Sequence, residues 1–399
     1  MFKQKIVSLS VASALLVMSG AASASGFALI EQSASGLGNA YAGGAASAED
    51  ASTVFFNPAG MSRIEGKQFA VAVHAITPSA KYTSSAGVAS GGDAGGTAIV
   101  PNAYFTMEVQ PGLKAGLGIN APFGLQTDYD AGWAGQNQAL KSKLETINLN
   151  PSLSYQVNEA LSVGAGLDYQ HISGELSNYG GPVLGKSVVK GTDNAWGYNL
   201  GALYNVDDKT RLGIAYRSAV SYTLTGTVTT SLPFANGPVK LDVKLPDTWS
   251  FSVVHKMSDN YEVMADISRT GWSSFKQVNV LNSSNVSISN TIENWKDTTR
   301  VSVGATHHYN EQWTARAGFA YDQAPVPDAH RTARIPDNDR TWVALGGQYK
   351  LNKESAIDFG YAHLFVKNSS INSPTPAPAL VGSYKNKVDI MSVQYTQSF

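Results

Sequence analysis

Apolar and polar residues alternate with a period of two in many stretches of the chain. From Leu161 to Tyr169 the odd positions are Leu, Val, Ala, Leu and Tyr, and the even positions are Ser, Gly, Gly and Asp. Because successive side chains of a strand point to opposite faces, this pattern predicts strands with one apolar and one polar face. It recurs over residues 196–204, 211–217, 249–253, 261–268, 313–319, 357–365 and 391–399.

A soluble β-sandwich and a membrane β-barrel both contain such strands, and the polar face separates the two folds. In a sandwich this face meets bulk water and normally carries many Lys and Glu residues. Here it is mostly Gly, Ser, Thr, Asn and Gln, and charged residues make up only 15% of the chain. Aromatic residues such as Trp196 and Tyr204 bracket the strands, as in interfacial girdles. We therefore predict an all-β, antiparallel transmembrane barrel, with a sandwich as the alternative.

Short polar connectors and long Gly-, Ser- and Pro-rich tracts separate the predicted strands. The connectors are typical of tight hairpins at one rim and lie at 157–159, 205–209, 258–260, 310–312 and 352–354. The tracts are expected to be loops at the other rim and lie at 84–98, 126–142, 177–193, 226–246, 281–292, 323–339 and 367–384. Outer-membrane barrels have short periplasmic turns and long external loops, and the hairpins predict about fourteen strands.

The two ends of the chain indicate where the protein resides. A basic start and an apolar run up to Met18 precede Ala22-Ser23-Ala24, a spacing that signal peptidase accepts. Residues 1–24 are therefore predicted to be a cleaved secretory signal, with a membrane anchor as the alternative. The final residue, Phe399, resembles the end of chains that the barrel assembly machinery recognises. We expect a bacterial outer-membrane protein surrounded by outer-membrane lipid and lipopolysaccharide.

Overall composition narrows the class of partner. The net charge of -1 argues against nucleic acid. Cysteine is absent, which excludes disulfides, thiolate metal sites and cysteine nucleophiles. We expect no metal and no cofactor.

The segment between the signal and the first clear strand has a different character. Residues 25–66 are rich in Gly, Ala and Ser and lack sustained alternation. They contain Phe27, which needs burial, and helical turns are predicted to begin near Ser33 and Ser47. We predict a hatch that plugs the lumen of a barrel formed by residues 67–399, and a flexible extension is the alternative.

Several strings in the chain resemble those of the FadL family, the outer-membrane transporters of long-chain fatty acids and other hydrophobic compounds. In the hatch they are Gly26-Phe27, Ser35-Gly36-Leu37-Gly38 and Asn57-Pro58-Ala59. Further strings follow in consistent order, among them Trp196-Gly197, Tyr216-Arg217-Ser218, Leu245-Pro246 and Ile335-Pro336-Asp337. The resemblance covers nearly the whole mature chain.

The resemblance implies a fourteen-stranded barrel with a hatch and passive uptake of a hydrophobic small molecule. The ligand would be captured at external loops, bind against the hatch and leave sideways through the wall where the third strand kinks. Long-chain fatty acids are the expected cargo, and aromatic or alkane hydrocarbons are the alternative. An open diffusion porin and an outer-membrane lipid hydrolase are competing classes, but no nucleophile motif accompanies the histidines, so we expect no enzyme.

The resemblance also assigns roles in gating. Gly26 and Phe27 would form a movable N-terminus with Phe27 against the ligand, and a disordered terminus is the alternative. Asn57, Pro58 and Ala59 would hold the hatch against the wall, and an ordinary turn is the alternative. The kink is expected at Asn120, Pro122, Phe123 and Gly124, since Pro and Gly disrupt a ladder, and a plain strand end is the alternative.

One departure from the family pattern concerns the ligand's head group. Fatty-acid transporters are expected to meet the carboxylate with basic groups, but the corresponding residues here are Asn178 and Thr291. Either Arg217, Arg300 or Arg316 takes that role, or the cargo is less acidic than a fatty acid. The alternative for each arginine is an ion pair inside the lumen.

Overall fold

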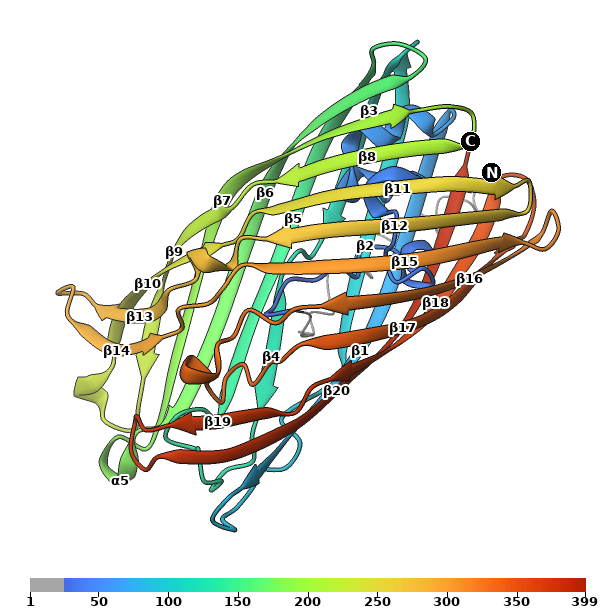
Figure 1. Ribbon diagram of the computed structural model, residues 1–399. Helices are drawn as coiled ribbons and strands as arrows, with labels where there is room; N and C mark the ends of the chain where they lie inside the picture. The colour runs from blue at the N-terminus through green and yellow to red at the C-terminus, as the bar shows by residue number, and fades with distance from the viewer. Residues whose placement is uncertain (1–24) are drawn as a thin grey trace, which may run out of the picture.

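The computed structural model describes residues 25–399, and the predicted signal segment lies outside them. In the described residues, twenty strand segments form one antiparallel sheet that closes on itself (Figure 1). The segments are β1 Lys67–Ser84, β2 Ala98–Gln110, β3 Leu113–Asn120, β4 Gly124–Asp128, β5 Lys141–Gln156, β6 Leu161–Tyr179, β7 Lys186–Asn205, β8 Thr210–Arg217, β9 Val220–Thr229, β10 Gly237–Leu245, β11 Thr248–Ser258, β12 Tyr261–Thr270, β13 Gln277–Asn282, β14 Ser287–Ile292, β15 Thr298–His308, β16 Trp313–Asp322, β17 Arg340–Lys350, β18 Ser355–Val366, β19 Ser369–Ser373 and β20 Leu380–Ser398.

Pairing of the first strand with the last closes the barrel. The ladder between β1 and β20 runs from Gln68 opposite Ser398 to Ser84 opposite Gly382. Six wall strands are each interrupted once, so the twenty segments make fourteen wall strands. A closed wall leaves no sheet edge exposed to lipid, where unpaired backbone groups would be costly. The predicted fold, a barrel of about fourteen antiparallel strands, is confirmed.

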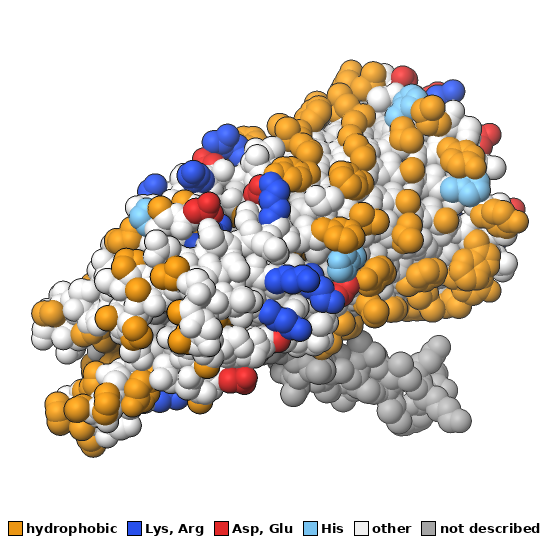
Figure 2. Space-filling model, turned by 60° about the horizontal axis from the view of Figure 1, so that its bottom comes forward, with side chains coloured by type: hydrophobic (Ala, Val, Ile, Leu, Met, Phe, Trp, Pro, Cys, Tyr) orange, Lys and Arg blue, Asp and Glu red, His pale blue; other side chains and the backbone are white. Residues whose placement is uncertain are grey.

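The outer face of the wall carries the predicted apolar residues. Leu167, Trp196, Phe251 and Phe319 are all exposed, although they are large and apolar. Figure 2 shows apolar side chains gathered in a band on the wall, with charged side chains clustered along one border of it. An exposed apolar band of this kind is the surface that lipid covers.

The short connectors form turns at one rim, as predicted, but several long tracts are not loops. Residues 177–193 were expected to be irregular, yet β6 and β7 pair as far as Tyr179 opposite Lys186. The same holds for β9 with β10. In β9 and β10 apolar residues still alternate with polar ones, but the apolar residues, such as Val220, Tyr222 and Val243, are buried and most of the polar ones are exposed, the reverse of the lipid-facing part of the wall.

Residues 25–66 lie inside the ring of strands (Figure 1). Their short helices are α2 Ala34–Leu37, α3 Gly44–Ser47, α4 Thr53–Phe56 and the 3-10 helix η1 Pro58–Arg63. Ser33 caps α2 by accepting from the Gly36 amide, as predicted. The turn predicted to begin near Ser47 is wrong, because α3 ends there and the next helix begins at Thr53. The other helices of the described residues belong to the connections between strand segments: α5 Gly181–Leu184 and the 3-10 helices η2 Pro233–Ala235, η3 Trp272–Ser274 and η4 Asp328–His330.

Small residues on both surfaces let the hatch backbone touch the wall. A Cβ atom on Gly213 would lie 1.9 Å from the Ala45 carbonyl oxygen, and one on Gly318 would lie 2.1 Å from the Asn39 carbonyl carbon. Any larger side chain at either position would displace the hatch. None of the helices in residues 25–399 has the length and apolarity needed to cross a membrane.

Candidate functional site

The third wall strand is interrupted by a kink. It consists of β3, which ends at Asn120, and β4, which begins at Gly124. The β2 strand pairs with β3 as far as Ala103 opposite Ile119, whereas β4 pairs with β5 alone among the described strands. The wall is therefore unpaired between residues 98–102 and β4. Pro122 explains this locally, because it lacks an amide donor.

The start of the hatch is hydrogen-bonded to this kink. The Leu29 amide donates to the Pro122 carbonyl at 2.8 Å, and the Gly124 amide donates to the Phe27 carbonyl at 2.9 Å. The Gly26 amide donates to Asp337 Oδ2 at 2.9 Å. The structure thus brings together two groups of residues that the sequence had assigned to gating separately.

Phe27 lies in a box of four aromatic rings. Its ring centroid is 4.7 Å from that of Trp272, 5.5 Å from Phe275, 5.5 Å from Trp295 and 6.1 Å from Phe123. Only 1% of Phe27 is exposed. Sequence reasoning missed Trp272, Phe275 and Trp295. Their signal was the presence of large aromatic residues in the polar stretches on either side of the predicted loop 281–292.

A cavity lies beside the box, between the hatch and the wall, and two rings of the box, Phe123 and Trp272, line it. It leaves about 140 Å³ for the centres of water molecules. Since one water needs about 10–15 Å³ by this measure, the space suits a ligand of many atoms. Its lining includes residues 28–30, Phe55, Pro122 and Phe123, together with Arg217 and Arg300. Asn178 and Thr291 are not part of this lining.

The three candidate arginines have different surroundings. Arg217 forms an ion pair with Asp168 and donates to the Phe55 carbonyl at 2.9 Å. Arg300 donates to the Ala40 carbonyl at 2.7 Å and to Ser302 at 3.3 Å, and no ion pair of Arg300 occurs within residues 25–399. No carboxylate of the described residues lies within ion-pair distance of its guanidinium, but Asp322, which is opposite Arg300 in the ladder between β15 and β16, lines the same cavity and interacts with it electrostatically.

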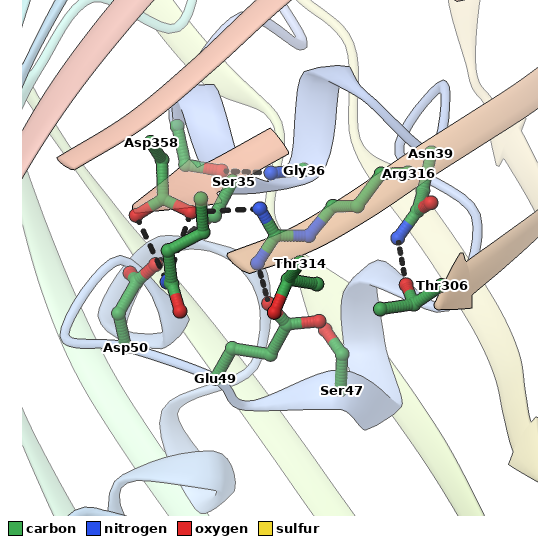
Figure 3. A network of polar contacts seen from close by, with 12 residues as sticks. Ser35, Gly36, Asn39, Ser47, Glu49, Asp50, Thr306, Thr314, Arg316 and Asp358 are labelled. Atoms are coloured by element: carbon green, nitrogen blue, oxygen red, sulfur yellow. Dashed lines mark hydrogen bonds and ion pairs between the residues drawn. The ribbon is translucent and has the colours of Figure 1, made fainter. Parts of the chain in front are cut away.

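Arg316 does not line the cavity. It donates to Asp358 at 2.7 Å and to Glu49 of the hatch at 2.8 Å (Figure 3). Nearby, Asp50 accepts from Ser35 at 2.7 Å and from Gln394 at 2.8 Å. This buried network joins the hatch to the wall, so Arg316 has a structural role here.

Asn57 makes a second connection between hatch and wall. Its Nδ2 atom donates to the Ala45 carbonyl at 2.6 Å and to the Ala202 carbonyl of β7 at 3.0 Å. Its Oδ1 atom accepts from the Ala59 amide at 3.0 Å. Pro58 begins η1, where a missing amide donor costs nothing, and it also lines the cavity.

A buried carboxyl group supports the aromatic box from the loop side. Trp295 Nε1 donates to Glu293 Oε2 at 2.9 Å. Burial raises the pKa of Glu293 to about 7, and the Arg334 charge partly opposes this shift. Within residues 25–399, no cluster of three or more His, Asp or Glu residues has the arrangement needed to hold a metal ion.

A closed, lipid-facing barrel with a plugged lumen and an apolar cavity is a membrane channel for hydrophobic compounds. The chain belongs to the family of outer membrane protein transport proteins (OMPP1/FadL/TodX), which matches residues 15–399. It is therefore a protein of the bacterial outer membrane, and members of this family are transport channels rather than enzymes.

Individual relatives and a solved structure agree with this assignment. The chain is 30% identical over 401 residues to the long-chain fatty acid transport protein of Salmonella typhi, covering 91% of this chain and 92% of that protein. It is 34% identical over 412 residues to outer membrane protein P1 of Haemophilus influenzae, covering 89% of both. The crystal structure of a Pseudomonas aeruginosa FadL homologue superposes with a TM-score of 0.87 at 26% identity, covering 94% of this chain and 99% of that one.

Proposed function

We propose that the protein takes up long-chain fatty acids passively, binding them in the cavity between the hatch and the kink. The observation that carries this proposal is the pairing of an apolar cavity wall with the Arg300 guanidinium, which forms no ion pair within residues 25–399 even though Asp322 lines the same cavity. An acyl chain fits the apolar side, and a carboxylate fits a buried guanidinium, which can form two parallel hydrogen bonds with it. Arg217 contributes less, because Asp168 already neutralises it.

The unpaired wall beside β4 is the proposed exit. Residues 98–102 face the kink without a backbone ladder, so a flexible chain can pass there without breaking strand hydrogen bonds. Moving from the cavity into the hydrocarbon of the bilayer keeps the acyl chain out of water, which is worth about 0.8 kcal/mol for each buried CH₂. Release therefore needs no ATP and no covalent chemistry.

The residues that close this exit are proposed to form the gate. Gly26 and Phe27 fill the space beside the cavity, and the backbone of residues 27–29 is bonded to the kink. Asn57, Pro58 and Ala59 hold the remainder of the hatch in place. Movement of the first few residues alone then opens a route to the wall.

A neutral aromatic hydrocarbon is the second candidate cargo. The observation that favours it is the aromatic box, whose rings could stack on an aromatic ligand that displaces Phe27. A neutral cargo would have no use for Arg300.

Uptake by cells that carry the Arg300→Gln variant separates the two cargoes. We expect at least a tenfold rise in the KM for oleate, since a charge-assisted hydrogen bond is worth about 1.5–3 kcal/mol. Toluene uptake should not change. Arg269→Gln, which removes an exposed arginine outside the cavity, is the matched control. Unchanged oleate kinetics in Arg300→Gln, or toluene uptake alone in the natural protein, would reject the fatty-acid proposal.

A further inference from the structure

Another interruption of the wall lies between the eighth and ninth strands. The β10 and β13 segments pair only from Val239 opposite Asn282 to Leu241 opposite Val280. Pairing resumes where the Gly271 amide donates to the Asp247 carbonyl at 2.9 Å. Between these points, residues 242–246 and 272–279 share no ladder in the part of the chain that the structure describes. The 3-10 helix η3 occupies the gap, and its first residue, Trp272, is buried against Phe27 of the hatch.

The outer surface of the wall is hollowed into a depression at this gap. It leaves about 500 Å³ for the centres of water molecules. Lys244, Lys276 and Asp242 lie at its exposed edge, whereas its lining also includes Tyr222, Val243 and Phe275, which are buried. These three residues belong to the same apolar cluster as Phe27. The floor of the depression is therefore the outer side of the cluster that surrounds the gate.

The depression lies on the loop side of the apolar band. Tyr216 and Trp249 are outward aromatic residues whose rings lie 4.5 Å apart, and they mark the border of the band. Lys244 precedes Trp249 on the same wall strand, and five residues span about 16 Å at the rise of a β-strand. The depression is thus level with polar head groups, within reach of molecules arriving from outside.

Charge at the edge favours an anion. Neither Lys244 nor Lys276 forms an ion pair with any residue in 25–399, whereas Asp242 accepts a hydrogen bond from Thr223 Oγ1 at 2.7 Å. Two free ammonium groups around an apolar floor match a molecule with an anionic head and one apolar chain. A neutral hydrocarbon would gain nothing from the lysines.

We infer that this gap is the inlet of the channel, where Lys244 and Lys276 receive the carboxylate of a long-chain fatty acid while its chain points toward Phe275. The inference rests on the proposed function and adds the route of capture. It places the inlet and the exit in different parts of the wall, with the aromatic box between them.

Charge reversal tests the lysines. Lys244→Glu/Lys276→Glu should raise the KM for oleate uptake about tenfold, with the maximal rate nearly unchanged. Each surface charge contributes only a small attraction to the oleate carboxylate, and reversing both lysines adds the two small effects. The matched control is Lys186→Glu/Lys385→Glu, which makes the same change in charge elsewhere on the external strands. Equal KM values in the two double variants would reject the inlet. The inlet would also be rejected if Lys244→Glu/Lys276→Glu lost co-purified lipopolysaccharide but kept the natural KM for oleate. Absence of oleate uptake in the natural protein would instead reject the proposed function itself.

Blocking the depression tests the route. The chain has no cysteine, so Gln277→Cys can be labelled uniquely on intact cells with a polyethylene-glycol maleimide. Labelling should reduce oleate uptake at least tenfold, whereas labelling Lys385→Cys should leave it unchanged. Full uptake after complete labelling of Gln277→Cys would show that the ligand enters elsewhere.

Discussion

Replacing Phe27 by alanine should open the gate without unfolding the barrel. The ring is 1% exposed and contacts four other aromatic rings. Truncating a buried Phe to Ala costs about 3–5 kcal/mol, and the lower end suits a segment that can partly collapse into the cavity. This cost falls on the closed position of residues 25–30, because these residues contribute no strand to the wall.

This free-energy cost corresponds to a change in the fraction of molecules whose gate is open. A loss of about 3 kcal/mol raises that population about a hundredfold. Ala28 lines the cavity, and the protein has no natural thiol, so Ala28→Cys can report the opening. We expect a water-soluble maleimide to label Ala28→Cys about a hundred times faster when Phe27→Ala is also present.

Two controls make the result specific. Phe27→Leu keeps most of the apolar volume and should accelerate labelling far less. Heat-modifiable migration in electrophoresis should show an intact barrel in every variant. A labelling rate at Ala28→Cys that does not respond to Phe27→Ala would refute the idea that burial of this ring holds the gate closed.

Three further changes test the rest of the site. Gly201→Ala should raise single-channel conductance in planar bilayers, because its Cβ would lie 1.9 Å from Asn57 Oδ1 and displace the hatch, whereas Gly237→Ala, with open space around it, should leave the channel silent. Glu293 binds its proton more tightly in the folded protein, so the stability of the loop around it should fall as the pH rises from about 4.5 to about 7. The mobility of a spin label at residue 28 would report this change, and Glu293→Gln should abolish the pH dependence. Deleting Ser25 to Ala28 should impair oleate uptake and leave the barrel folded, and normal uptake would contradict the gating role.

The wall was predictable because lipid contact leaves the period of two visible in the sequence. Leu167 and Phe319 face outward, as their places in the alternating apolar pattern predict. The break between β3 and β4 is also visible in the sequence, since Pro122 has no amide to donate to a ladder, whereas Gly124 pairs with Glu145 as the first residue of β4. The strand segments beyond the apolar band were missed because they lie in tracts rich in Gly, Ser and Pro, although β10 keeps a period of two from Val239 to Leu245, with its apolar residues buried instead of facing lipid.

The contents of the lumen were much less predictable. The alternation of apolar and polar positions shows that Arg217, Arg300 and Arg316 point inward. It does not show what they contact, because a barrel brings together residues from strands that are distant in the sequence. Their partners, Asp168, the Ala40 carbonyl, and Glu49 with Asp358, follow only from the packing of the hatch. The aromatic box was missed for the same reason, since its members come from four separate segments of the chain.

Opening the gate and freeing the kink are one event, because they share hydrogen bonds. When residues 27–29 move away, Gly124 loses the acceptor of its amide and Pro122 loses the donor to its carbonyl. Each backbone group left buried and unpaired costs about 1–3 kcal/mol, so both groups must find water in the adjacent cavity or another protein partner. An acyl chain cannot replace either bond, so the kink must relax toward other partners whenever the ligand displaces Phe27. Since coupling between two sites is reciprocal, a substitution that relaxes the kink must also weaken the closed gate.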